Sequence, residues 1–222
     1  MIEIHWASGS PMAWPIQIAL REKEIPHRSI NINFSDGDNK TPEFLARNPR
    51  GKVPVLMDGD VAVYESHAIM DYLERYFPKV PLLPSDKAGA AADLSRRLEI
   101  NYIYPAADAA ISYTSYSSAL RREDWDRQRL ETLSEPLVQE FQRWDSYLDG
   151  RQWLGRDDGP GQSDIFFIPL LMYMNRFGFD YQQREFSNLA RYFAVAKQRP
   201  SVTETWPPHW LTSDGDPTFA IA

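Results

Sequence analysis

The chain has 222 residues, of which 43% are hydrophobic and 25% charged, so it can bury a core and keep a well-solvated surface. This length accommodates one large domain or two of about 80–130 residues each. The net charge of −7 argues against a nucleic-acid-binding protein, which would show a basic face. The absence of cysteine excludes disulfides, thiolate metal sites and a cysteine nucleophile. Any thiol chemistry must therefore use a thiol that a ligand brings.

The amino terminus, "MIEIHWASGS", lacks the basic and the long apolar regions that define a signal peptide. No stretch of the sequence approaches the ~18 consecutive apolar residues that a membrane span requires. We therefore expect a cytoplasmic protein with no membrane partner.

The first part of the chain predicts a β-α-β unit. Alternating apolar residues indicate strands at 2–6 and 29–33. Between them, the run 12–25 has helical spacing, and Pro15 is tolerable only in a first helical turn. A right-handed crossover makes the two strands parallel.

The next segment predicts a short helix, a hairpin and a further helix. Thr41 and Pro42 have the residue types of an N-cap and a first helical position. Two short apolar runs flank Asp58-Gly59, which is a strong hairpin pattern. Residues 66–77 then carry apolar side chains at helical spacing, which predicts a helix with one buried face.

The remainder of the chain predicts helices only. A proline-rich linker at 79–85 precedes helical patterns at 86–120, 122–148 and 188–199 and an all-round apolar helix at 163–179 that Pro169 should kink. The tail is irregular but carries tryptophans, so we expect it to pack on another part of the chain. The predicted architecture is an α/β domain at 1–78, the linker, and an all-helical domain at 86–222.

Three motifs in this order of elements resemble the cytosolic glutathione transferases. They are "SPMAWPIQIAL" (10–20), which is similar to the serine-using classes, "NPRGKVPVL" (48–56) and "YESHAIMDYL" (64–73). The resemblance covers nearly the whole chain. It implies a thioredoxin-like N-terminal domain that binds glutathione as co-substrate and a helical domain that binds a hydrophobic electrophile. It also implies a homodimer with a role in detoxification.

The resemblance implies which residues bind glutathione. A cis Val53-Pro54 bond would present the backbone of Val53 to the cysteinyl part of the tripeptide. Glu65 would take the α-ammonium, while the Ser66 hydroxyl and a helix N-terminus would take the α-carboxylate. The alternative is that Ser66 is only an N-cap worth about 1 kcal/mol and that Glu65 is solvated.

Lys52 resembles the residue that contacts the glycine carboxylate in related classes. A single lysine before an apolar strand could instead keep a sheet edge soluble. Several family members place a histidine after the Asn-Pro pair, whereas this chain has Arg50-Gly51. The glycine-carboxylate contact therefore stays open.

The resemblance assigns catalysis to an early hydroxyl group. A free thiol with a pKa near 8.5 is only about 3% ionised at pH 7, and a hydroxyl that donates to the sulfur favours the thiolate. No tyrosine precedes Tyr64, which leaves Ser8 and Ser10. We favour Ser10, because its spacing from the Ile-Ala-Leu sequence matches the plant-type serine classes. The alternative is that both serines serve only the turn.

Candidates for the co-substrate pocket are Met12, Tyr113, Tyr116 and Trp210, although aromatic residues at helical spacing are more often core. Asp164 is expected to bond backbone amides in the first turn of its helix, a structural role. The same machinery could run ether cleavage, dehalogenation, isomerisation or peroxide reduction. The fold could also serve as a non-catalytic interaction module.

Overall fold

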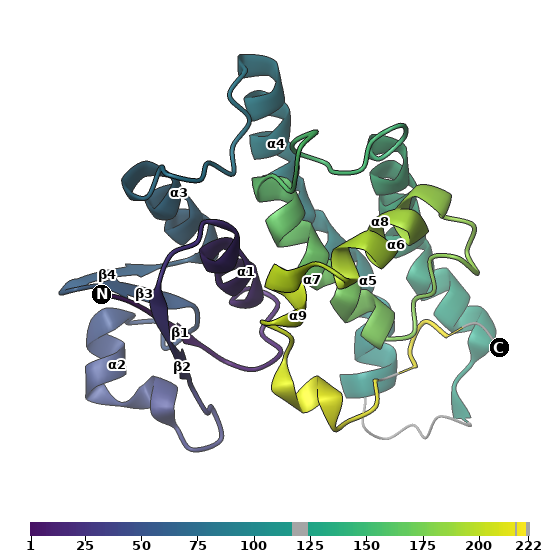
Figure 1. The fold of residues 1–222 in the computed structure, drawn as a ribbon. Helices are drawn as coiled ribbons and strands as arrows, with labels where there is room; N and C mark the ends of the chain where they lie inside the picture. Colours follow the sequence, from purple (N-terminus) through teal and green to yellow (C-terminus); the bar gives the residue numbers. More distant parts are fainter. Residues whose placement is uncertain (117–123, 216, 221–222) are drawn as a thin grey trace. The chain divides into compact units, whose positions relative to one another are not determined.

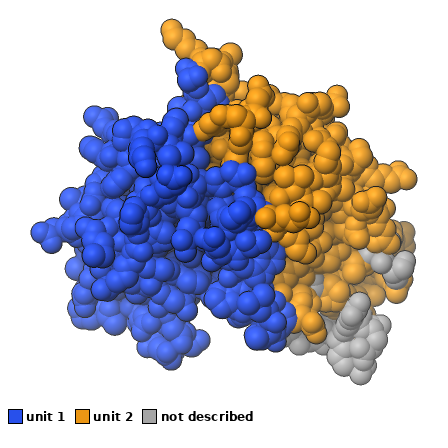
Figure 2. Space-filling model, in the orientation of Figure 1, with its two compact units in different colours: residues 1–85, 199–213 blue, residues 86–198, 214–222 orange. Residues whose placement is uncertain are grey.

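The computed structural model describes residues 1–116, 124–215 and 217–220, with Ser115 and Tyr116 described by their backbone only. The chain divides into two compact units (Figure 2). The first unit contains residues 1–85 together with 199–213, and the second contains 86–198 together with the chain from 214 onward. Among the described residues, no helix is long and apolar enough to cross a membrane.

A mixed four-stranded sheet forms the centre of the first unit. Its strands are β1 (Ile2–Trp6), β2 (His27–Asn31), β3 (Val55–Asp58) and β4 (Val61–Tyr64), in the order β2-β1-β3-β4. The β1–β2 pair is parallel and the other pairs are antiparallel, which confirms the β-α-β unit and the hairpin. β2 begins two residues before the strand predicted at 29–33. In the observed register, Ile2 at the start of β1 pairs with His27.

Helices cover both faces of this sheet: α2 (Pro42–Arg47) lies on one face, and α1 (Trp14–Glu22) and α3 (Ser66–Tyr76) lie on the other (Figure 1). Side chains alternate along β1, so the His5 ring meets the Phe44 ring of α2 with centroids 6.2 Å apart, while Ile4 is fully buried on the opposite face. Pro15 lies in the first turn of α1, as predicted.

The predicted cap of α2 is confirmed. Thr41 has extended backbone angles and its Oγ1 accepts a hydrogen bond from Phe44 N at 3.2 Å. Pro42 follows as the first helical residue, where its missing N–H would have no partner in any case. Local sequence alone therefore determines where this helix begins.

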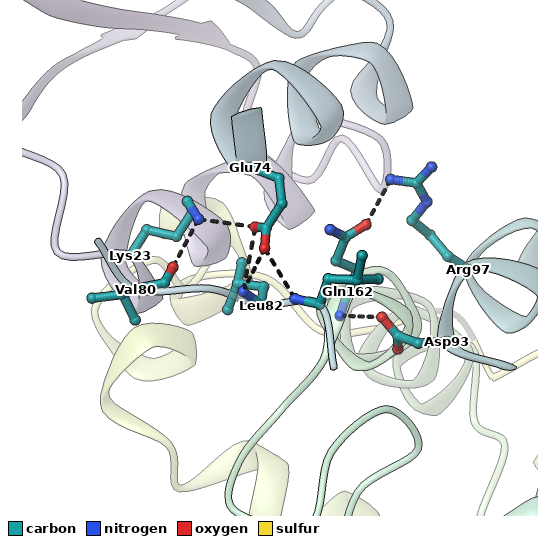
Figure 3. Close-up of polar contacts among 8 residues, drawn as sticks. Lys23, Glu74, Val80, Leu82, Asp93, Arg97 and Gln162 are labelled. Atoms are coloured by element: carbon teal, nitrogen blue, oxygen red, sulfur yellow. Dashed lines mark hydrogen bonds and ion pairs between the residues drawn. The ribbon is translucent and has the colours of Figure 1, made fainter. Parts of the chain in front are cut away.

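A buried lysine attaches the linker to α1 and α3. The side chain of Lys23 is fully buried, and its Nζ donates to Glu74 Oε2 at 2.9 Å and to Val80 O at 2.7 Å. The carboxylate of Glu74 also accepts from the backbone amides of Leu82 and Leu83, each at 3.1 Å (Figure 3). Burying the lysine charge without these partners would be costly, because the ammonium group would lose its hydrogen bonds to water. The ion pair therefore fixes the path of the linker.

The segment 199–213 packs on the first unit through α1. Arg199 donates to both carboxylate oxygens of Glu22, at 2.6 and 2.7 Å. The indole N–H of Trp14 donates to Thr205 Oγ1 at 2.9 Å in a buried contact. The expectation that the tail packs on another part of the chain is confirmed, and for this segment the partner is the first helix, about 180 positions earlier in the sequence.

The second unit is helical: α4 (Lys87–Glu99), α5 (Ile103–Ile111), α6 (Arg127–Tyr147), α7 (Gln162–Arg176) and α8 (Ser187–Lys197). The expectation of one continuous helix over 86–120 is wrong, because a 3₁₀ turn at Ile100–Tyr102 separates α4 from α5. Pro105 explains the break, since its ring collides with the carbonyl four residues earlier. Most of the predicted junction at 120–126 lies outside the described residues.

Two buried carboxylates cap the N-terminus of α7. Asp164 accepts from the amides of Leu154, Gly155 and Gly161, at 2.8, 2.9 and 2.8 Å, and from the Tyr192 hydroxyl at 2.8 Å. Burial raises the pKa of Asp164 to about 6 in spite of these donors. The structural role predicted for Asp164 is thus confirmed, but the predicted partners are wrong. Its amide donors are the N-cap Gly161 and two loop residues that precede the helix, not residues of the first turn.

Asp93, a residue of α4 that the sequence did not single out, completes this cap. Its carboxylate accepts from the amide of Gln162 at 3.0 Å (Figure 3) and from the amide of Ser163 at 3.0 Å. The Gln162 side chain in turn accepts from Arg97 at 2.7 Å. Burial raises the pKa of Asp93 as well, and the bond from the Ser163 hydroxyl opposes that shift.

Candidate functional site

The turn between β1 and α1 positions Ser10 at the start of a helical segment. Ser10 N donates to Ala7 O at 3.0 Å, which closes the turn, and Ser10 O accepts from Trp14 N at 3.1 Å. The Ser10 Oγ accepts from Ala13 N at 3.2 Å. Its hydroxyl proton has no acceptor among the described residues, so this half-buried group can donate to a ligand.

Ser8 has a different environment in the same turn. Its Oγ lies 2.7 Å from Nδ1 of His209, so this hydroxyl already shares a hydrogen bond within the first unit. The two serines left open by the sequence are therefore not equivalent, and the geometry favours Ser10 as the hydroxyl available to a ligand.

The N-terminus of α3 has no side-chain cap. Glu65 is the N-cap residue, with φ +69° and ψ 122°, and its exposed side chain makes no capping hydrogen bond. A non-glycine residue in such a conformation costs of order 1–3 kcal/mol and is typical of functional sites. The first-turn amides of α3 have no intrahelical acceptor, so they remain suited to an anion.

Ser66 is the first helical residue of α3 rather than its N-cap, so the alternative role proposed for it is wrong. Its side chain is buried, with 6% exposure, and its Oγ donates to Met12 O at 2.7 Å. This bond ties the start of α3 to the turn that carries Ser10. The sequence predicted Ser66 as a hydroxyl donor to a ligand, but that proton is already used.

The segment before β3 contains the expected cis peptide bond between Val53 and Pro54. Val53 packs against a small apolar cluster that includes Phe44 and Val55. Lys52 is exposed, and its carbonyl accepts from the Asn48 side chain at 2.8 Å. Because β3 lies between β1 and β4, Lys52 protects no sheet edge, and that alternative is wrong.

The candidate pocket residues separate into two groups. Met12, 37% exposed, and Trp210 belong to the first unit with Ser10, and Trp210 packs edge-on against Trp14 with ring centroids 5.4 Å apart. Tyr113 belongs to the second unit, where its hydroxyl accepts from Asp126 N at 3.1 Å and Arg129 lies over its ring at 4.8 Å. The side chain of Tyr116 lies outside the described residues.

Two features of the structure escaped the sequence reasoning. His209 contacts the serine turn, and the only hint was its place in the aromatic sequence "WPPHW". A cavity of about 220 Å³ lies in the second unit, where Trp125, Leu130, Arg184 and Phe219 contribute to its lining. No pattern in the sequence indicated it, and among the described side chains Met12, Tyr113 and Trp210 do not line it. The described residues contain no cluster of acidic and histidine side chains that could hold a metal ion.

Comparison with known proteins agrees with this geometry. Residues 9–75 match the family model described as "Glutathione S-transferase, N-terminal domain". The chain is 30% identical over 215 residues to glutathione S-transferase A of Pleuronectes platessa, covering 94% of this chain and 92% of the relative. It is similar to the crystal structure of a glutathione S-transferase from the Antarctic clam Laternula elliptica, with a TM-score of 0.89, 32% identity and coverage of 99% and 98%.

A more distant relative is named for a different activity. Maleylacetoacetate isomerase of Pseudomonas aeruginosa is 28% identical over 173 residues, which covers 76% of this chain and 79% of that protein. The chain has the thioredoxin-like domain and the helical region of the glutathione transferase fold. It belongs to the glutathione S-transferases, a family of enzymes that use glutathione as co-substrate.

Proposed function

We propose that this protein conjugates the glutathione thiolate to hydrophobic electrophiles and that Ser10 stabilises the thiolate. The observation that carries the proposal is the environment of the Ser10 hydroxyl. Its oxygen accepts from Ala13 N at the start of a helical segment, and its proton is available to a sulfur atom. The amide that bonds the oxygen also polarises the O–H group, which strengthens it as a donor.

The energy required is modest. Lowering the thiol pKa from about 8.5 by two units, which makes the thiol mostly ionised at pH 7, takes roughly 2.7 kcal/mol of differential stabilisation. A charge-assisted hydrogen bond contributes about 1.5–3 kcal/mol, and a helix N-terminus adds about 0.3–1 kcal/mol. Together, the hydrogen bond from Ser10 and the nearby start of α1 could therefore supply the required stabilisation of the thiolate.

The head of the tripeptide would bind at the start of α3. The carboxylate of Glu65 would take the α-ammonium, and the backbone amides of the first turn would take the α-carboxylate. Because the Ser66 hydroxyl donates to Met12 O, Ser66 would contribute its amide and an accepting oxygen. Val53 would bond the cysteinyl part through its backbone, and Lys52 would reach the glycine carboxylate.

The electrophile would be apolar, and Met12, Tyr113, Tyr116 and Trp210 remain the candidates to contact it. A flat aromatic co-substrate would gain most from such side chains. A two-domain division near residues 79–85, a homodimer and a cytoplasmic location complete the proposal.

Glutathione-dependent isomerisation is the second candidate. It is supported by the similarity to maleylacetoacetate isomerase of Pseudomonas aeruginosa. In that reaction the thiolate would add reversibly to a conjugated double bond, allow rotation and then leave. Glutathione would be regenerated rather than consumed.

Calorimetry with reduced glutathione, followed by turnover assays, tests the proposal. We expect binding of glutathione and its stoichiometric consumption with an activated aromatic halide. Isomerisation of a cis-enedione acid without loss of glutathione would favour the second candidate. Absence of any affinity for glutathione would overturn both.

A further inference from the structure

The tail of the first unit reaches the serine turn through His209 and Trp210. The Nδ1 atom of His209 lies 2.7 Å from Ser8 Oγ. A Cβ atom built on Gly9 would lie 2.5 Å from Cε1 of His209 and 3.4 Å from the indole nitrogen of Trp210. Gly9 also has φ +76°, so a larger residue here would be strained and would displace the His209 ring. The tail and the turn are thus packed in direct contact.

Contacts along α1, rather than the Ser8 bond alone, determine where His209 lies. Arg199 forms a two-pronged ion pair with Glu22 at the end of α1. Trp206 packs edge-on against Trp14 with centroids 5.4 Å apart, next to the bond from Trp14 to Thr205. Two consecutive prolines then precede His209, and proline restricts the backbone. His209 is therefore presented to the turn by a pre-organised segment.

Ser10 is coupled to Ser8 through a short backbone path. The turn closes by the bond from Ser10 N to Ala7 O at 3.0 Å, so Ser8 and Gly9 are its two central residues. The backbone of this turn has little intrinsic rigidity, because glycine has the widest range of backbone angles. An external hydrogen bond at Ser8 and the packing against Gly9 supply the restraint that this sequence lacks.

We propose that His209 is a positioning residue for the thiolate site: by its hydrogen bond to Ser8 it holds the turn so that the Ser10 hydroxyl points at the sulfur. This inference depends on the proposed role of Ser10. Hydrogen bonds weaken steeply with misalignment, and a displacement near 1 Å can cost up to about 100-fold in rate. The tail of the chain therefore contributes to catalysis without touching the reacting atoms.

Variants at His209 and Ser8 test the inference. His209→Leu removes the ring nitrogen, His209→Asn offers a side-chain amide near the Nδ1 position, and Ser8→Ala removes the partner. We expect His209→Leu and Ser8→Ala each to lower kcat about 10-fold and to raise the apparent pKa of the bound glutathione thiol, read from thiolate absorbance. The Kd of glutathione should change by less than about 3-fold, and His209→Asn should recover most of the activity.

The double variant Ser8→Ala/His209→Leu separates a shared bond from two independent effects. If the bond is the cause, the double variant is no worse than either single one. His27→Leu is the control, because His27 Nδ1 bonds Ile25 O at 2.8 Å outside the serine turn. Its thiol pKa and kcat should equal those of the wild type.

Three results would overturn the inference: an unchanged thiol pKa in His209→Leu, additive losses in the double variant, or no recovery by His209→Asn. Ser10→Ala, measured in parallel, distinguishes this failure from that of the proposed function. A large effect of Ser10→Ala with none from His209→Leu removes only the positioning role. If Ser10→Ala has no effect, the role of Ser10 and the inference both fail. Should His209→Leu fold poorly, the kcat and thiol pKa of Ser8→Ala and His209→Asn test the inference instead.

Discussion

The N-termini of α7 and α3 are helix starts that the chain treats in opposite ways. At α7 the carboxylates of Asp93 and Asp164 are buried and fully supplied with backbone donors. At α3 the N-cap Glu65 is exposed, has a positive φ and makes no capping bond. The first arrangement stabilises the fold, whereas the second leaves first-turn amides and a carboxylate for a ligand.

The contrast teaches how to recognise a binding site among capped helices. Both helices begin with polar residues, and residue type alone does not distinguish them. At a helix start such as that of α7, the carboxylates and the amides already bond one another, so these groups are not left to bind a ligand. Where backbone strain coincides with an unused carboxylate, as at Glu65, the cost of order 1–3 kcal/mol needs a compensating role. The predictions below test this distinction.

The largest expected effect is on stability. In Asp164→Asn the side-chain oxygen can accept from only some of the four donors. The side-chain NH₂ group cannot accept a hydrogen bond, so the remaining donors lose their acceptor. Two buried donors without an acceptor cost about 1–3 kcal/mol each, so we expect a loss of about 4 kcal/mol in the free energy of unfolding. Urea denaturation measures it. Asp157→Asn, the same change on an exposed side chain, should stay within about 0.5 kcal/mol.

The pH dependence of stability provides a second test of the buried cap. The folded-state pKa of Asp164 is about 6, above its ordinary value of 3.8. The folded state therefore holds the proton more tightly. This tighter proton binding adds up to about 3 kcal/mol to the free energy of unfolding. The contribution is fully present below pH 4 and is lost as the pH rises through 6. The difference in unfolding free energy between the wild type and Asp164→Asn should thus shrink from about pH 4 to 6. A difference that grows over this range would contradict the assignment.

The next effect concerns turnover. Ser10→Ala should lower kcat/KM about 100-fold, or about 2.7 kcal/mol, because it removes the hydroxyl that we propose donates to the sulfur. The apparent pKa of bound glutathione should rise by about two units. Ser10→Thr, which keeps a hydroxyl, is the matched variant and should retain part of the activity. Equal activity of Ser10→Ala and the wild type would remove Ser10 from the mechanism.

The smallest predicted effect is on affinity. Glu65→Gln should weaken glutathione binding about 10-fold, or about 1.4 kcal/mol, with kcat at saturation nearly unchanged, since Glu65 would bind the far end of the tripeptide. A glutathione analogue without its α-amino group should bind the wild type and Glu65→Gln equally. If the variant weakens both ligands alike, Glu65 does not bind the ammonium. Glu43→Gln, on an exposed carboxylate of α2, serves as the control.

Local patterns predicted most of the first unit because its elements have short-range causes. Pro15, the Thr41-Pro42 pair and the Asp58-Gly59 turn each determine a backbone conformation within a few residues. The break between α4 and α5 was missed because the apolar spacing continues across it, although Pro105 marks it. Long-range partners could not be read in this way.

The candidate site shows the same division. The motif around Glu65 and Ser66 located the start of α3, but the bond from Ser66 to Met12 joins residues 54 positions apart. The pairing of Ser8 with His209 spans 201 positions, and only folding reveals it. Sequence spacing predicts neighbours along a helix or strand, whereas contacts between elements depend on packing.

By itself, the sequence determined the order of strands and helices, the absence of a cysteine nucleophile and the motifs of the glutathione transferases, since periodicity, turn residues and composition act locally. The tertiary structure decided that Ser8 bonds His209, that Asp93 shares the cap of α7, and that residues 199–213 pack on the first unit. The reason is physical. Hydrogen bonds and side-chain packing act over a few ångströms of space, and folding brings distant residues within that range.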